Sequence, residues 1–136
     1  MGERFPARLA RAIGYPDPVP ADAAGATLLV DGQEVAATEE GGRALLMATV
    51  AAGPSGETLA SLAGYAAGRA LREEAVLAYD PKADAALLWQ AAPSGAGALA
   101  LRDFFRDFTA SWDWWRARAA ELESPQPSFP EVMIRP

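Results

Sequence analysis

Residues 26–52 read ATLLVDGQEVAATEEGGRALLMATVAA, and this stretch decides the fold class. It holds three apolar runs separated by two short polar turns, and the runs span residues 26–30, 33–38 and 43–52. The first turn is Asp31-Gly32, a strong signal for a two-residue β-hairpin. The second turn contains two glycines, which supply the positive φ that tight turns require. The stretch therefore predicts three consecutive antiparallel strands.

The segments on either side of this meander predict helices and two further strands. Apolar residues spaced by three and four positions predict helices over residues 4–14, 57–74 and 98–123. Two more apolar runs, at 75–79 and 85–91, flank a connection rich in turn-forming residues. The order is α-β-β-β-α-β-β-α. Consecutive strands with separately placed helices favour an α+β fold with an antiparallel five-stranded sheet and three helices.

The last predicted helix has the clearest periodicity in the sequence. Its apolar stripe alternates steps of four and three through Leu101, Phe105, Phe108, Trp112, Trp115, Ala119 and Leu122. This spacing is typical of a buried face, so we expect the stripe to be core. Trp114 lies about 180° around the helix from Phe105 and should be more exposed.

The C-terminal stretch differs in composition from the rest of the chain. Its prolines, which break helices and strands, are Pro125, Pro127, Pro130 and Pro136. We predict that residues 1–123 form a single domain and that residues 124–136 form a Pro-rich extended tail. The apolar residues of this tail are Phe129, Val132, Met133 and Ile134.

The composition excludes several kinds of chemistry. The 136 residues include no cysteine and no histidine, which rules out disulfides, thiolate nucleophiles, Ser-His-Asp triads and Cys/His zinc sites. A formal net charge of −6 repels a phosphate backbone, so we expect no nucleic-acid partner. Neither a signal peptide nor an apolar stretch of ~20 residues is visible, so we expect a cytoplasmic protein with no membrane partner.

Two local patterns offer chemistry, and each has a simpler explanation. Residues 53–58, GPSGET, lie where a phosphate-binding loop would lie, but they lack the lysine of that motif, and Ser55 suits a helix cap. Asp80 and Asp84 could share a metal, but calcium needs six or more oxygens, and a solvated turn accounts for both. Solvated charges also account for the acidic pairs Glu39/Glu40 and Glu73/Glu74. We therefore predict no enzyme, no cofactor and no metal.

The strands are apolar on both faces. Along residues 43–52, Leu46 and Val50 face one way and Met47 faces the other, and neither set is polar. Because a sheet covered on one side alternates apolar and polar residues, we expect apolar side chains on a face that the helices leave open. The candidates for contact with a partner are Leu46, Val50, Leu87 and Trp89. The alternative is that the first and last helices cover opposite faces and leave nothing open.

The second predicted helix has a face of small residues that includes Gly64 and Gly68. Each glycine costs up to ~1 kcal/mol in helix propensity relative to alanine, so some contact should compensate. Close packing on the sheet and close approach of a second copy of the chain are both open. With the apolar strands, this face leads us to expect a homodimer. The expected contacts are Ala63, Gly64, Ala66, Ala67, Gly68, Ala70, Val76 and Ala78.

The order of elements, the placement of the hairpin and the acidity together resemble the class I type III secretion chaperones of the CesT/Tir-chaperone family. The matching stretches, within about residues 3–123, are LLVDGQEVAAT, RALLMATVAAGP, ETLASLAGYAAGRALREE and AVLAYDPKADAALLWQAAP. The final helix is more aromatic than the family pattern, and the Pro-rich tail is an addition to it.

The resemblance implies a protein without catalytic residues. It implies a homodimer that binds the N-terminal region of a secreted effector and keeps it extended and secretion-competent. The four apolar strand residues named above would then contact the effector. The alternative is a non-enzymatic regulatory or immunity-type binding module of similar fold, and an enzyme comes third.

Overall fold

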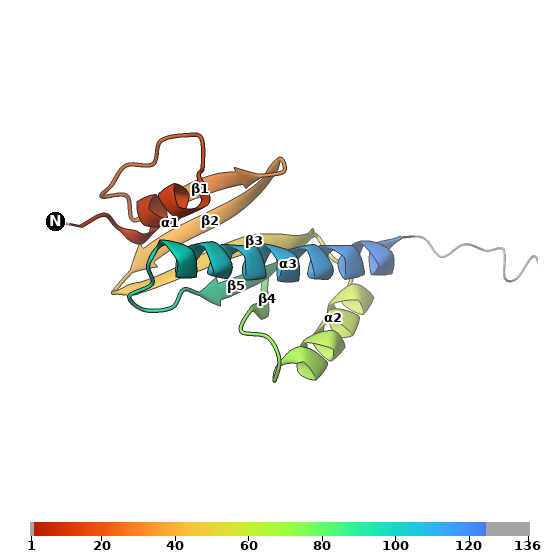
Figure 1. Ribbon diagram of the computed structural model, residues 1–136. Helices are drawn as coiled ribbons and strands as arrows, with labels where there is room; N and C mark the ends of the chain where they lie inside the picture. Colours follow the sequence, from red (N-terminus) through yellow and green to blue (C-terminus); the bar gives the residue numbers. More distant parts are fainter. Residues whose placement is uncertain (1, 125–136) are drawn as a thin grey trace, which may run out of the picture.

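The computed structural model describes residues 2–124 and confirms the predicted order of elements (Figure 1). The helices and strands are α1 (Phe5–Ile13), β1 (Gly25–Val30), β2 (Gln33–Glu40), β3 (Arg43–Ala52), α2 (Gly56–Arg69), β4 (Val76–Asp80), β5 (Ala85–Ala91) and α3 (Ala98–Glu123). The predicted tail, apart from Ser124, lies outside the described residues. No helix within residues 2–124 has the length and apolarity needed to cross a bilayer.

The five strands form one antiparallel sheet in the order β1-β2-β3-β5-β4. The turn between β1 and β2 is the predicted hairpin, in which Asp31 and Gly32 have φ values of 52° and 78°. Positive φ at both positions is typical of a type I′ turn, whose twist matches that of the strands. After β3 the chain leaves the sheet through α2, forms the edge strand β4 and returns as β5 alongside β3.

Helices α1 and α3 pack against each other and on the same face of the sheet (Figure 1). The largest fully buried side chains between these layers are Phe5, Leu9, Leu28, Leu46, Leu62, Leu88, Phe108, Trp112 and Trp115. The alternative in which the first and last helices cover opposite faces is therefore wrong. In the described part of the chain, the other face of the sheet carries no helix.

The buried stripe of α3 differs from the predicted stripe at two positions: Phe104 replaces Phe105, and Leu122 is only partly buried. Phe104 is buried and Phe105 is only partly buried. The ring of Phe104 lies edge-on to that of Phe5 on α1, with 6.3 Å between centroids. The indole N–H of Trp112 donates to the carbonyl oxygen of Thr49 on β3 at 2.7 Å. The buried stripe is Leu101, Phe104, Phe108, Trp112, Trp115 and Ala119.

Helix α2 lies beside the sheet, next to α3 and the edge strand β4 (Figure 1). It begins at the predicted cap, where the Ser55 hydroxyl accepts a hydrogen bond from the Thr58 N–H at 3.1 Å. It ends at Arg69, five residues before the predicted end at residue 74. Only Thr58 and Leu62 of this helix are buried, so α2 presents most of its surface to solvent.

Candidate functional site

The sheet face opposite α1 and α3, which we name the uncovered face, is apolar. All five strands contribute to it, and its apolar members are Leu29, Ala36, Leu45, Met47, Val76, Ala78, Leu87, Trp89 and Ala91. Strand alternation places them there, because their neighbours along the strands, such as Leu46 and Leu88, point into the core. Met47 and Trp89 are partly exposed, and Leu29 is 57% exposed.

A continuous apolar row crosses four strands of the uncovered face. Ala36 on β2 is paired with Met47 on β3, which is paired in turn with Trp89 on β5. Trp89 is also paired with Val76 on the edge strand β4, where Val76 remains 42% exposed. Residues directly opposite one another on neighbouring strands have Cβ atoms about 4.5–5.5 Å apart, close enough to form one surface. An exposed apolar strip of this kind is typical of a protein-binding site.

Two hollows lie along this row. A hollow of about 150 Å³ is lined by Met47 and Leu87, with Glu34 beside them. A larger groove of about 530 Å³ runs past Trp89 to the loop formed by residues 92–95. Hollows between strands accept single side chains of an extended segment, which gives selectivity for particular apolar residues.

The charged residues of the uncovered face are mainly acidic. Alternation places Glu34 and Glu40 of β2 and Asp80 of β4 on this face. Arg43 of β3 is the basic counterpart and is paired in register with Glu40. Glu34 and Asp80 therefore leave a negative margin, which favours a segment with basic rather than acidic flanks.

The structure divides the four predicted contact residues between the two faces of the sheet. Leu87 and Trp89 lie on the uncovered face and are partly exposed. Leu46 and Val50 lie in the core, with Leu46 0% exposed, so their predicted placement on the open face is wrong. Both faces of β3 are apolar, so alternation separates two sets of residues without saying which set the helices cover. For this reason Met47 is absent from the contact residues predicted from the sequence. Its pairing with Trp89 places it on the uncovered face.

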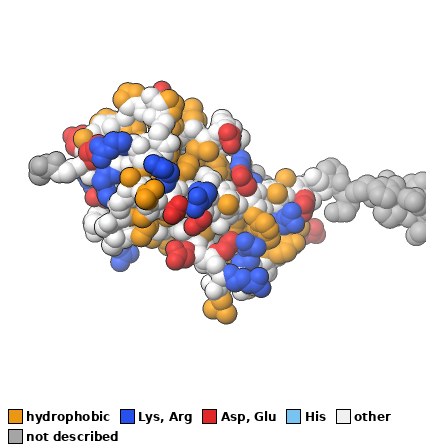
Figure 2. Space-filling view, viewed as in Figure 1, with side chains coloured by type: hydrophobic (Ala, Val, Ile, Leu, Met, Phe, Trp, Pro, Cys, Tyr) orange, Lys and Arg blue, Asp and Glu red, His pale blue; other side chains and the backbone are white. Residues whose placement is uncertain are grey.

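The small residues of α2 line a surface that is left open by the rest of residues 2–124. Most of the predicted dimer contacts are exposed, namely Ala63, Gly64, Ala67, Gly68, Ala70, Val76 and Ala78, and Ala66 is partly buried. A Cβ atom built at Gly64 or Gly68 would meet nothing within 4 Å. Close packing on the chain's own sheet is therefore not what these glycines provide. Figure 2 shows hydrophobic side chains gathered over α2, beside a group of basic ones.

Between α2 and β4 lies a groove of about 300 Å³, the α2–β4 groove. Its walls include Ala66, Ala70 and Leu77, with Trp115 of α3 also lining it. The groove continues the exposed small-residue surface onto the edge strand, where Val76 is exposed. Helix and strand therefore present one connected apolar surface at this edge of the sheet.

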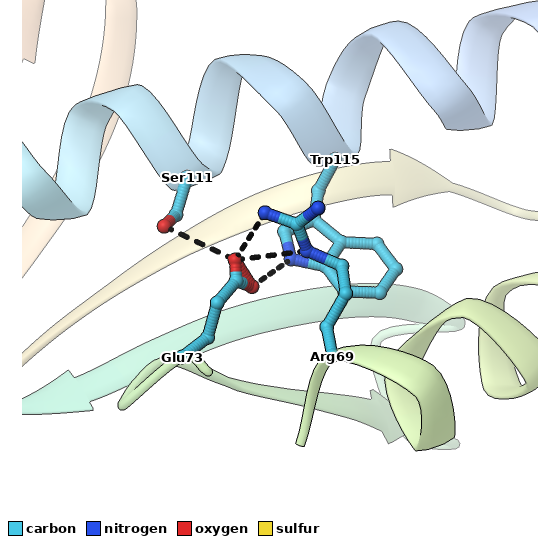
Figure 3. Close-up of polar contacts among 4 residues, drawn as sticks. All are labelled: Arg69, Glu73, Ser111 and Trp115. Carbon is cyan, nitrogen blue, oxygen red and sulfur yellow. Dashed lines mark hydrogen bonds and ion pairs between the residues drawn. The ribbon is translucent and has the colours of Figure 1, made fainter. Parts of the chain in front are cut away.

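The Glu73 carboxylate fastens the loop after α2 to α3 (Figure 3). Arg69 donates to Glu73 Oε2 from Nε at 3.0 Å and from Nη2 at 2.8 Å. From α3, the indole N–H of Trp115 donates to Oε1 at 3.2 Å, and the Ser111 hydroxyl donates to Oε2 at 3.4 Å. The Arg69 guanidinium also lies over the ring of Trp114, 3.8 Å from its centroid. We name these contacts the Glu73 node.

The Glu73 node keeps the carboxylate ionised. Burial by itself raises the pKa of Glu73, but hydrogen bonds from Arg69, Trp115 and Ser111, together with the charge of Arg69, outweigh burial and hold the pKa below its ordinary value. The bond to Glu73 in turn raises the pKa of Arg69. A carboxylate held in this way serves as a structural anchor at the wall of the α2–β4 groove.

The polar residues that could carry chemistry stabilise turns and helix ends. Asp80 accepts a hydrogen bond from the Lys82 N–H at 3.0 Å. Asp84 accepts one from the Tyr79 hydroxyl at 2.7 Å, and this bond raises the pKa of Tyr79. Among residues 2–124, no three His, Cys, Asp or Glu side chains come together in a way that could hold a metal ion.

The architecture is the one that the resemblance to class I type III secretion chaperones implies, and solved structures share it. One is a chain of the HopA1–SchA chaperone–effector complex, 16% identical, with a TM-score of 0.64 over 82% of this chain and 89% of that chain. Another is a chain of the ExsC–ExsE complex, 18% identical, with a TM-score of 0.66 over 83% and 89%. No family model and no curated protein matches the sequence. The resemblance is thus confirmed at the level of the fold.

Proposed function

We propose that this protein is a cytoplasmic, non-enzymatic type III secretion chaperone that binds the N-terminal region of a secreted effector and keeps it extended. The observation that carries the proposal is the apolar row from Ala36 to Val76, which lies open on a sheet whose other face is fully packed. The shared fold with a chain of a chaperone–effector complex supports it. Neither nucleic acid nor a membrane is required as a partner.

An extended client segment suits this surface in geometry and in energy. A segment with apolar side chains at alternate positions can place them over Met47, Leu87 and Trp89 and into the hollows beside them. Edge strands offer backbone hydrogen bonds as well, although on β1 the Leu29 N–H already donates to the Tyr15 hydroxyl at 3.0 Å. Because ordering a flexible client costs several kcal/mol, the contact should bury ~1,000–3,000 Å².

We propose Leu45, Met47, Leu87 and Trp89 as the residues that contact the client. They occupy neighbouring positions on β3 and β5, and all are partly exposed. Leu46 and Val50 are left out because they fill the core of the chain itself. The negative margin from Glu34 and Asp80 gives preference to a client with basic residues beside its apolar ones.

The test is co-expression with the product of the neighbouring reading frame, followed by proteolysis of the captured complex. We expect protection of a segment of some tens of residues near the partner's N-terminus. Trp89→Asp should abolish capture, whereas the matched control Arg106→Ala, on the exposed side of α3, should leave it intact. A folded partner with no protected extended segment would instead favour a regulatory or immunity-type binding module.

We also propose a homodimer built on α2 and β4. The exposed small-residue surface, the open space at Gly64 and Gly68 and the adjoining α2–β4 groove support this contact. The expected contact set is the one predicted from the sequence, from Ala63 to Ala78. Light scattering at micromolar concentration should give about twice 14.3 kDa.

The dimer surface can be tested without harming the fold. Gly64→Leu and Gly68→Leu place side chains where the chain itself has open space, and leucine raises helix propensity. We expect both variants to be folded monomers of 14.3 kDa. Ala110→Leu on the exposed side of α3 is the matched control and should stay dimeric. A monomeric wild-type protein, or two dimeric glycine variants, would exclude this contact.

A further inference from the structure

A polar hollow of about 460 Å³ lies on the helix side of the sheet, apart from the uncovered face. The strand β5, the helix α3 and the loop after α2 enclose it, and we name it the Gln90 hollow. Its polar lining residues besides Arg69 are Arg72, Glu73, Glu74, Gln90, Asp107 and Ser111.

The Gln90 side chain marks this hollow as a binding site. Gln90 is only 7% exposed and lies on the face of the sheet that α1 and α3 cover. Within residues 2–124, no hydrogen bond reaches its side-chain amide, and the Ser111 hydroxyl beside it is spent on Glu73. Buried amides in folded proteins are almost always paired, so an unpaired one at the wall of a hollow points to a partner from outside the chain.

The charges around the hollow favour a cation. Asp107 on α3 and Glu74 on the loop both line it, and neither carboxylate forms an ion pair within residues 2–124. The Arg69 guanidinium lies 2.8 Å from the Glu73 carboxylate, so these two charges offset each other. Among the described residues that line the hollow, two unpaired carboxylates therefore face one unpaired cation, Arg72. A further positive charge is favoured there, and an anion is not.

The uncharged groups of the hollow accept hydrogen bonds as well. The Ser111 hydroxyl donates its proton to Glu73 Oε2 at 3.4 Å, which leaves the lone pairs of its oxygen as acceptors. The Gln90 amide supplies a carbonyl acceptor, and its N–H₂ group can donate to a partner's backbone. Acceptors on several walls suit a guanidinium, which carries five N–H donors in one plane.

We propose that the Gln90 hollow binds an arginine side chain of the client. This inference rests on the proposed function, because it takes the client as the partner, and it adds a contact on the opposite side of the sheet. The guanidinium pairs with the carboxylates of Asp107 and Glu74 and accepts no bond itself, while the Gln90 carbonyl receives one of its N–H groups. Arg72 then turns to solvent.

The sheet edge connects this hollow to the uncovered face. Trp89 and Gln90 are consecutive residues of β5, so their side chains point to opposite faces of the sheet. The edge strand β4 begins at Val76, which is paired with Trp89. Gln90 therefore lies one residue past the end of the β4–β5 pairing. A client that covers Trp89 can cross the edge here and place an arginine a few residues further along in the hollow.

The experiment uses the full chain, two small probes and no client. N-acetyl-arginine amide carries the guanidinium without charged ends, and N-acetyl-citrulline amide has the same shape without the charge. We expect the arginine probe to shift the NMR signals of the Gln90 side-chain amide. The citrulline probe should bind about fivefold more weakly, the factor that a partly solvated charge pair supplies.

Variants of the hollow test the same contact. Asp107→Asn should weaken binding of the arginine probe about fivefold, because it removes a charge partner. Asp103→Asn is the matched control, since Asp103 lies one turn earlier on α3 and is paired with Arg106, and it should bind as wild type does. Arg72→Ala removes the competing cation and should strengthen binding. Gln90→Leu keeps the size of the side chain and should weaken binding.

The same pair of aspartate variants is then tested on the captured client. Asp107→Asn should lower the affinity for the client about fivefold, and Asp103→Asn should not change it. An unchanged affinity in Asp107→Asn would overturn the assignment of the hollow to the client. A change in the light-scattering mass of Asp107→Asn would instead assign the hollow to a second copy of the chain.

The probe measurements can also overturn the proposal by themselves. Equal binding of the two probes would remove the recognition of charge, and a Gln90 signal that neither probe shifts would remove the site. Equal weakening by Asp103→Asn and Asp107→Asn would leave only a general attraction to an acidic helix. Because the probes replace the client, their failure leaves the protease-protection test of the proposed function standing, and failure of that test leaves the probe result intact.

Discussion

At the scale of single residues, Glu73 shows how one partly buried charge can fix a peripheral helix to the rest of the domain. Its side chain is only 10% exposed, and Arg69, Trp115 and Ser111 supply its donors. The sequence indicated only a solvated pair with Glu74, although the spacing of four from Arg69 was a visible sign of pairing. The contacts from α3 lie some 40 residues away along the chain, and no local pattern reveals them.

Glu73→Gln should weaken the attachment of α2 to α3 while keeping a side chain of the same shape in the Glu73 node. Glutamine keeps the shape but loses the charge that strengthens the hydrogen bonds from Arg69, so we expect a loss of about 1–3 kcal/mol in the free energy of unfolding. Urea titration followed by circular dichroism measures it. Glu74→Gln is the matched control, since Glu74 is exposed, and it should leave the unfolding midpoint unchanged. Equal stability of the two variants would remove the structural role assigned to the node.

The Glu73 node also predicts a pH dependence. Because the pKa of Glu73 is lower in the folded chain than in the unfolded one, its contribution is complete above the ordinary glutamate pKa of about 4.3 and is lost as the pH falls through the folded value. The stability difference between wild type and Glu73→Gln should therefore be constant from pH 7 to about 5 and shrink at lower pH. Other carboxylates, such as Glu123, are present in both proteins, so their contributions cancel in the stability difference. A difference that stays constant down to pH 3 would contradict the assignment.

At the scale of elements, helix α3 could be predicted from the sequence almost completely, and the exchange of Phe104 for Phe105 in its buried stripe is informative. The bounds agree residue for residue, but the stripe passes through Phe104 rather than Phe105. Either phenylalanine gives an apolar stripe with spacings of three and four residues. At 3.6 residues per turn, adjacent positions lie only 100° apart around the helix axis. Phe104 is the buried one because its ring packs against Phe5 of α1. That contact joins segments about 100 residues apart in the sequence.

This choice predicts unequal costs for two neighbouring substitutions. Phe104→Ala should lower the free energy of unfolding by about 3–5 kcal/mol, because it leaves a cavity between α1 and α3. Phe105→Ala, at the partly buried position, should cost well under half as much. Thermal unfolding of the pair measures the difference directly. Equal costs would mean that the helix is rotated toward the stripe expected from the sequence.

Strand β3 illustrates what sequence periodicity cannot decide. Its bounds and its two apolar sets were predicted correctly, yet the set assigned to the open face was the buried one. A period of two separates the faces, whereas the choice of covered face depends on where α1 and α3 dock. Within residues 2–124, the expectation that a face remains open is confirmed, because α1 and α3 both pack on the other face.

At the scale of the whole molecule, burial is uneven in a way that favours association. One face of the sheet is closed by two helices around large aromatic side chains, while the other keeps the apolar row from Ala36 to Val76 and an exposed Leu29 on β1. The small-residue surface of α2 adds a second apolar region at the β4 edge. Two such regions on a chain of 136 residues allow one to hold a second copy while the other holds a client.

The two faces of β3 can be separated by substitutions at adjacent residues. Leu46→Glu buries a charge among core side chains with no partner, so we expect loss of the folded circular dichroism spectrum. Met47→Glu places the same charge on the uncovered face, where it stays partly solvated, and we expect a wild-type spectrum. Because it puts a charge between Ala36 and Trp89, Met47→Glu should nevertheless abolish capture of the client. Met47→Leu keeps the apolar row and should bind as wild type does. A folded Met47→Glu variant that still protects its partner from protease would move the client site away from the uncovered face, to the α2–β4 groove or a sheet edge.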